Sequence, residues 1–96
     1  MTHREDNRLL LEGAVNVGTV SALLSAGADH VRDGAEVIDF AAVTAVDSAA
    51  VALALALVRA AGAAGRTVTF ANVPVAMSQL AELYGVSAFI PLASGH

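Results

Sequence analysis

Asp47 and Ser48 are the two neighbouring residues best placed to do chemistry, because they follow a hydrophobic run and open a long helical pattern. An aspartate just before a helix can accept hydrogen bonds from the free N–H groups of the first turn, so Asp47 is expected to be an N-cap. Ser48 would then hold its hydroxyl near solvent, at a helix N-terminus that tolerates a phosphate. Phosphorylation would add about −1.5 to −2 charge beside Asp47 and would oppose an apolar contact.

A second polar cluster surrounds His30, with Asp29, Asp33 and Glu36 close by in sequence. Metal binding is one interpretation of this composition. However, the cluster spans a predicted helix end and a glycine turn, and no second histidine is near. We therefore expect a solvated helix C-terminus, with His30 interacting with the helix dipole, and no metal site.

Catalytic and nucleotide-binding motifs are not apparent. Ser-His-Asp chemistry would need a histidine near Ser48, whereas the three histidines stand in the N-terminal segment, at a helix end and at position 96. The glycines of residues 62–65 are not followed by Lys-Ser/Thr, so no phosphate-binding loop or cofactor is predicted. Asp39 lies within an apolar strand, and we expect it to be structural and paired with N–H donors.

Composition narrows the class of protein further. The chain has 96 residues, a net charge of −4, five arginines, no lysine and no cysteine. An acidic chain without a basic run argues against nucleic acid and anionic membrane surfaces as partners. The apolar stretches are too short and too interrupted to span a bilayer, and the charged N-terminus is unlike a signal peptide. We expect one soluble, intracellular domain without direct membrane insertion.

Hydrophobic periodicity predicts alternating strands and helices. Strands are expected at 8–15, 35–41 and 67–71, with a last short edge strand at 88–92. Helices are expected from 16 to about 31, at 47–61 and at 75–84. Residues 1–7 are expected to be a flexible tail, and 8–96 a single domain. This order predicts an α/β fold, in which helices pack against a small, mostly parallel sheet of about four strands.

The helix at 47–61 is apolar almost all round. Val51, Leu55 and Val58 share one face, which we expect to pack on the sheet, whereas Leu53 and Leu57 lie on another. A surface helix normally carries polar residues on its second face. Two explanations remain open: neighbouring helices cover that face, or Leu53 and Leu57 form a partner-binding face.

Several segments together resemble the STAS domain, which occurs in anti-sigma-factor antagonists, anion-transporter tails and phospholipid ABC transporters. They are the runs 37–40, 43–48 and 66–72 and the Leu-rich helix between them, and the resemblance covers about residues 8–92. Residues 72–74 and 80–86, with the Ala-Leu alternation of 52–57, are similar to the MlaB-type subgroup.

The resemblance implies a non-catalytic protein that binds a nucleotide-handling partner around the Asp-Ser position. An MlaB-type subunit would bind and support the ATPase of a phospholipid-transport ABC complex, in the cytoplasm at the inner membrane. The residues implied in partner binding are Asp47, Ser48, Ala49 and Ala50.

The alternative is an anti-sigma-factor antagonist that is switched by phosphorylation of Ser48. Such antagonists usually carry Asp-Ser-Ser-Gly-Leu at this helix start, and Ser48 matches their phosphorylated residue. Here Ala50 replaces the glycine that lets a partner backbone approach closely. This departure argues against recognition by an anti-sigma kinase.

Overall fold

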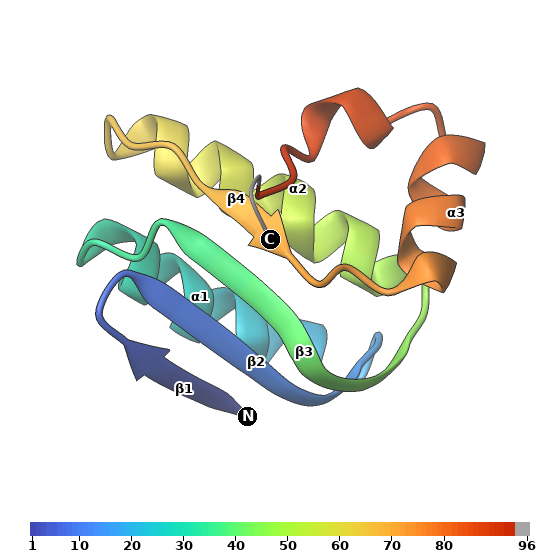
Figure 1. Ribbon diagram of the computed structural model, residues 1–96, viewed down its shortest axis with the longest axis horizontal. Helices are drawn as coiled ribbons and strands as arrows, with labels where there is room; N and C mark the ends of the chain where they lie inside the picture. The colour runs from blue at the N-terminus through green and yellow to red at the C-terminus, as the bar shows by residue number, and fades with distance from the viewer. Residues whose placement is uncertain (94–96) are drawn as a thin grey trace.

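Alternating apolar side chains along Arg8–Val15 produce strand β2, with Leu9, Leu11 and Val15 buried on one face. The computed structural model describes residues 1–93 (Figure 1). The remaining elements are β1 (Thr2–Glu5), α1 (Val20–Arg32), β3 (Val37–Val46), α2 (Ser48–Ala63), β4 (Thr69–Ala71), α3 (Val75–Leu83) and the 3₁₀ helix η1 (Ser87–Phe89).

The four strands form one sheet in the order β1-β2-β3-β4. β1 is antiparallel to β2, whereas the β2–β3 and β3–β4 pairings are parallel. The crossovers between the parallel strands contain α1 and α2, as the alternation of strand and helix patterns requires. The predicted class, a small and mostly parallel sheet with helices packed against it, is confirmed.

The hydrophobic core lies between the sheet and the helices α1 and α2, which Figure 1 shows behind the strands. Phe40 of β3 and Phe70 of β4 meet there with ring centroids 6.3 Å apart and a tilt of 54°. Because strand side chains alternate between faces, Asp39 points away from this core, toward the opposite face of the sheet.

Two register shifts bend the carboxyl half of β3. Leu10 pairs with Asp39 but Glu12 pairs with Ala42, and a second shift follows Gly13, so β3 contains one extra residue at each place. Gly13 has a φ of +88°, which glycine adopts without a Cβ penalty. The bulges increase the local twist and lead the chain toward the start of α2.

Residues 2–5 are not part of a flexible tail, and this prediction is wrong. They form β1, which is joined to β2 by a tight turn in which Asp6 adopts a φ of +53°. The turn is held to the next part of the sheet, because the Asn7 carbonyl accepts from the N–H of Glu36 at 2.7 Å. β1 escaped prediction because its residues are polar on both faces and therefore show no hydrophobic alternation.

The strand expected at 88–92 is also wrong for most of its length, because residues 87–89 form η1. A single parallel bridge joins Leu92 to Phe70. Its hydrogen bonds run from Phe70 N–H to the Pro91 carbonyl and from Ala93 N–H to the Phe70 carbonyl, both at 2.9 Å. We call residues 90–93 the C-terminal strap; it covers the outer edge of β4.

Candidate interaction site at the start of α2

Asp47 occupies the turn between β3 and α2 and is anchored on both sides. Its N–H donates to the Val15 carbonyl at 3.2 Å, which ties the turn to the end of β2. Its carboxylate accepts from the N–H of Ala49 at 2.8 Å and so caps α2. The predicted N-cap is confirmed. Asp47 is partly buried, and its carboxylate has a structural role in the folded chain.

Ser48, the first residue of α2, is exposed. Within residues 1–93 its hydroxyl takes part in no hydrogen bond, whereas the neighbouring Asp47 side chain does. The side chain lies at the N-terminus of a 16-residue helix, where the unpaired N–H groups carry partial positive charge. The position therefore combines accessibility with a local field that favours an anion.

A rigid turn lies beside Ser48 at the same edge of the sheet. Asn16 Oδ1 accepts from Gly18 N–H at 2.8 Å and from Thr19 N–H at 3.1 Å, and Thr19 Oγ1 donates to the Ala14 carbonyl at 2.9 Å. These bonds hold Val17, which is 81% exposed. Val17 is not among the residues predicted to bind a partner, although the Asn-x-Gly-Thr pattern of 16–19 is typical of a turn stabilised by an Asn side chain.

α3 contributes a second exposed apolar residue to this region. Its first residue, Val75, is 72% exposed, and α3 packs against α2 (Figure 1). Val17 and Ser48 follow the carboxyl ends of the neighbouring parallel strands β2 and β3. The accessible serine therefore lies between connections that each expose a valine, an arrangement suited to contact with another protein.

The expectation that Leu53 and Leu57 face a partner is wrong, because they are 1% and 0% exposed. α1 packs on this side of α2, and a Cβ placed on Gly27 would lie 3.0 Å from Leu57 Cδ2. Leu55 and Val58, which were expected to face the sheet, are partly buried and line a hollow beside η1. The alternative explanation, that neighbouring elements cover the second face, describes the structure.

The residues after Ser48 are less accessible than a contact surface requires. Ala49 is partly buried, and Ala50 is fully buried in the core. The expectation that the Ala50 side chain meets a partner is therefore wrong. Its methyl group points into the protein and does not obstruct the surface at this helix start.

Asp39 has the structural role that was expected. Its carboxylate accepts from Arg8 Nη1 at 2.7 Å, from Ala41 N–H at 2.8 Å and from Asn72 Nδ2 at 2.9 Å. Burial raises the pKa of this carboxyl, but the three hydrogen bonds and the arginine charge outweigh it, so its pKa lies below the ordinary 3.8. The carboxylate stays charged and joins β2 and β3 to the residue after β4.

His30 lies near the C-terminal end of α1, as expected, and contacts β1. Arg4 Nη1 lies 3.1 Å from His30 Nδ1 and donates to the His30 carbonyl at 3.3 Å. Residues 1–93 contain no group of three or more side chains suited to hold a metal ion. In the same part of the chain, no helix has the length and apolar character needed to cross a membrane.

Comparisons with known proteins agree with this architecture. A family model described as "Mlab, STAS domain" matches residues 2–92. The anti-sigma factor antagonist SpoIIAA in its unphosphorylated form is similar in structure, with a TM-score of 0.69, 17% identity, and coverage of 98% of this chain and 87% of that one. Phosphorylated SpoIIAA from Bacillus matches with a TM-score of 0.65 and 18% identity, over 98% of this chain and 90% of that one.

A third solved structure, reported as a crystal structure analysis of Mglu, is similar over part of its length. It has a TM-score of 0.56 and 29% identity, over 78% of this chain and 19% of that one. The comparison with curated proteins found no match.

Proposed function

The chain belongs to the MlaB-type STAS domain family, and from this premise we propose that it is a non-catalytic subunit of a phospholipid-transport ABC complex. In this proposal it binds the ATPase of that complex and supports its assembly and activity. It would lie in the cytoplasm at the inner membrane, held there through its partner. No cofactor is involved.

One observation carries the proposal: Ser48 is exposed at a capped helix start, between connections that expose Val17 and Val75. The surface is rigid on both sides, since Asp47 is anchored to Val15 and the 16–19 turn has its own hydrogen bonds. A rigid surface loses little conformational entropy on binding. Ser48 has no hydrogen-bond partner for its hydroxyl among residues 1–93, and exposed apolar side chains beside such a residue favour docking of a protein.

The alternative function is an anti-sigma-factor antagonist that is switched by phosphorylation of Ser48. It draws support from the exposed hydroxyl and from the similarity of the fold to SpoIIAA, whose structure is known in unphosphorylated and phosphorylated forms. Burial of Ala50 weakens the earlier argument against this alternative, because its methyl group does not project toward a kinase. Both functions therefore use the same helix start and differ in the partner protein that binds there.

Recovery of partners from the protein's own cells tests the proposal. Tagged wild type and the variants Ser48→Ala and Ser48→Asp are compared, with bound proteins identified by mass spectrometry. We expect an ABC ATPase to be recovered with wild type and with Ser48→Ala. Ser48→Asp should recover it about tenfold less, since a second carboxylate beside Asp47 must be desolvated on binding.

The outcome separates the two functions. Recovery of a serine kinase of the anti-sigma kind in place of an ATPase overturns the proposal in favour of the alternative. Equal ATPase recovery with wild type and Ser48→Asp overturns the placement of the contact at this helix start.

A further inference from the structure

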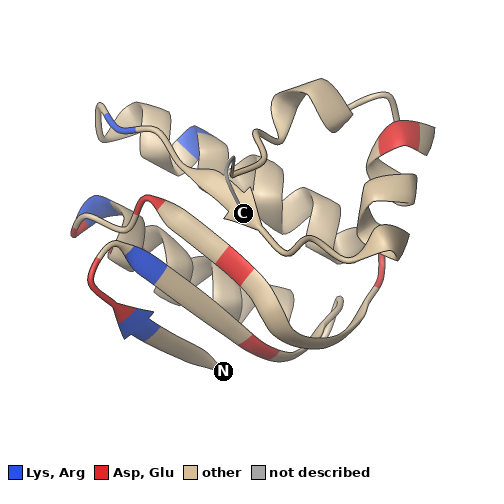
Figure 2. Cartoon of the chain, viewed as in Figure 1, with Lys and Arg blue, Asp and Glu red and all other residues tan. Residues whose placement is uncertain are grey.

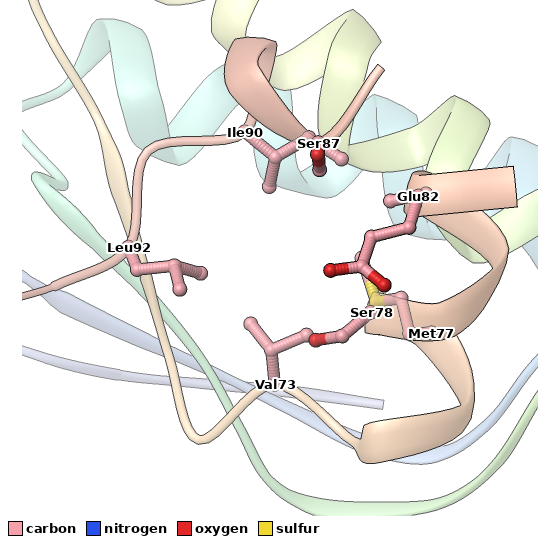
Figure 3. Close-up of a pocket in the computed structure, with 8 residues that line it drawn as sticks. Val73, Met77, Ser78, Glu82, Ser87, Ile90 and Leu92 are labelled. Carbon is pink, nitrogen blue, oxygen red and sulfur yellow. The ribbon is translucent and has the colours of Figure 1, made fainter. Parts of the chain in front are cut away.

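A cavity of about 130 Å³ lies between α3 and the segment formed by η1 and the C-terminal strap (Figure 3). Its floor and walls are apolar: Val73, Met77, Ala81, Ile90 and Leu92. For comparison, a protein cavity of roughly 150 Å³ holds a benzene molecule. The hollow therefore has the size of one side chain.

The backbone holds this cavity open from both ends. Val86 N–H donates to the Ala81 carbonyl at 2.9 Å, which fixes the turn after α3, and the strap is bonded to Phe70 of β4. Between these anchors, Ser87 is the residue of η1 that lines the cavity. These bonds fix the backbone on both sides of the cavity.

Among residues 1–93, Glu82 is the charged residue that lines the cavity. Figure 3 shows the Glu82 carboxylate directed over the opening, with the hydroxyls of Ser78 and Ser87 on either side. Glu82 is the single acidic residue between positions 48 and 93. Within residues 1–93 it forms no ion pair, and Figure 2 shows it as the only charged residue of α3.

An apolar hollow with one carboxylate at its mouth matches a ligand with an aliphatic stem and a cationic head. Lysine and arginine side chains have this form, because they bury their methylene groups while the charged end stays at the surface. A hydrogen bond to a carboxylate is stronger when its donor is positively charged. Glu82 is exposed, so an anionic ligand would be repelled by its charge and a neutral ligand would gain nothing from it.

The surroundings favour a protein as the source of that cation. Leu92, which lines the cavity, and Leu83, next to Glu82 in the sequence, are largely exposed. Exposed apolar residues beside a hollow favour the docking of a protein, whereas a free amine would leave them uncovered.

We propose that this cavity receives one lysine or arginine side chain of a partner protein, with Glu82 pairing its charge and the exposed apolar residues covered by the segment around it. This assignment goes beyond the proposed function, since it concerns a site other than Ser48 and specifies the chemistry of the bound residue.

NMR titration of the isolated protein tests the chemistry without any partner. The probes are n-butylammonium and n-butylguanidinium, with n-butanol and butyrate as neutral and anionic analogues. We expect millimolar, saturable shifts of amides in α3 and residues 86–92 with the two cations. Glu82→Gln should weaken their binding at least about fivefold, whereas Glu5→Gln, an exposed carboxylate on β1, should leave it unchanged. Equal binding of butanol, or no effect of Glu82→Gln, overturns the proposal.

Partner recovery then distinguishes a protein side chain from a free amine. Glu82→Lys places a like charge at the mouth and should reduce recovery of the partner that wild type binds, while Glu5→Lys should not. Cation binding by NMR with unchanged recovery for Glu82→Lys assigns the cavity to free amines and overturns the docking proposal. The NMR result does not depend on the partner's identity. Cation binding can therefore be absent while the proposed function holds, and cation binding can be present while the proposed function is wrong.

Discussion

Asp39 stays charged although it is only 5% exposed, because three hydrogen-bond donors converge on its carboxylate. Each comes from a different part of the chain: Arg8 from β2, Ala41 from β3 itself, and Asn72 from the turn after β4. Asn72 has a φ of +54°, a backbone conformation that asparagine tolerates better than most residues. A single carboxylate thus links β2, β3 and the residue after β4 on the face of the sheet opposite the helices.

Replacing this carboxylate by an amide should destabilise the protein in a pH-dependent way. Asp39→Asn keeps the shape but removes the charge, and we expect a loss of about 1–2 kcal/mol at pH 7, moderated because the Arg8 side chain is partly solvated. The folded pKa lies below 3.8, so the carboxylate's contribution is complete above the unfolded pKa and is lost as the pH falls through the folded pKa.

Urea unfolding at pH 7 and pH 3 measures this difference. The gap in unfolding free energy between wild type and Asp39→Asn should be smaller at pH 3. Asp33→Asn, which alters a strongly exposed carboxylate, should show little change at either pH. An equal gap at both pH values would contradict the role assigned to Asp39.

Removal of the Asp47 cap and removal of the Ser48 hydroxyl should have clearly different effects on the free energy of unfolding. Asp47→Ala removes the acceptor for Ala49 N–H and should cost about 0.5–2 kcal/mol. Ser48→Ala changes an exposed side chain without hydrogen bonds in residues 1–93 and should stay within about 0.5 kcal/mol. Thermal or urea unfolding of both variants checks this, and a Ser48→Ala loss as large as that of Asp47→Ala would assign Ser48 a structural role.

At the scale of the element, α2 shows why an all-apolar helix resists assignment of its faces. The sheet and α1 cover the side that bears Leu53 and Leu57, and η1 partly covers the side that bears Leu55. Hydrophobic periodicity distinguishes a buried face only when the opposite face is polar. Here Ala and Leu alternate without a polar stripe, so the sequence supports either orientation.

Alanine substitutions along α2 should reveal this burial directly. Leu53→Ala removes a fully buried side chain and should cost about 2–5 kcal/mol of unfolding free energy. Leu55→Ala, on the partly covered side of the same helix, should cost clearly less. Both are measured by urea unfolding, and a larger loss for Leu55→Ala would reverse the faces described above.

The contact between α1 and α2 predicts a coupling between Gly27 and Leu57. A methyl group at Gly27 would press on the end of the Leu57 side chain, which offsets the roughly 1 kcal/mol that alanine gains over glycine inside a helix. In the Leu57→Ala background that pressure disappears. Gly27→Ala should therefore be more favourable by about 0.5–1 kcal/mol in that background than in wild type. A double-mutant cycle measures the difference, and additive effects would show that the helices adjust freely.

At the scale of the whole molecule, the sequence predicted the interior of the fold better than its margins. The strand 8–15 matches β2, α2 begins after the expected Asp47 cap, and α3 begins at the expected residue 75. Strong periodicity and helix-start chemistry are local, so they are visible in sequence. β1 pairs with the neighbouring β2 but has no hydrophobic alternation of its own, and the strap depends on pairing with the distant β4.

The candidate site was predictable only in part, for the same reason. Asp47 and Ser48 stood out through their position at a helix start. Val17, Val75 and the cavity beside Glu82 depend on how separate segments meet in the folded chain.

Loss of β1 should therefore affect the entire domain. A chain without residues 1–6 lacks the antiparallel ladder and the hydrogen bond from Glu12 N–H to the Met1 carbonyl. Several hydrogen bonds worth roughly 0.5–1.5 kcal/mol each predict a loss of about 2–4 kcal/mol. The exposed edge of β2 should also promote association, which light scattering would detect. Unchanged unfolding and a monomeric state would show that β1 is dispensable.

The C-terminal strap also sets an order of events during synthesis. Phe70 leaves the ribosome before the residues that bond to it, and the chain from there to Ala93 takes about 1–5 s at roughly 5–20 residues per second. During that interval β4 has a bare outer edge, and the cavity beside Glu82 lacks the wall that Leu92 provides. In a nascent chain, the Asp47–Ser48 segment is therefore translated well before the cavity beside Glu82 is complete. The surface at the start of α2 forms first, and the cavity forms after it.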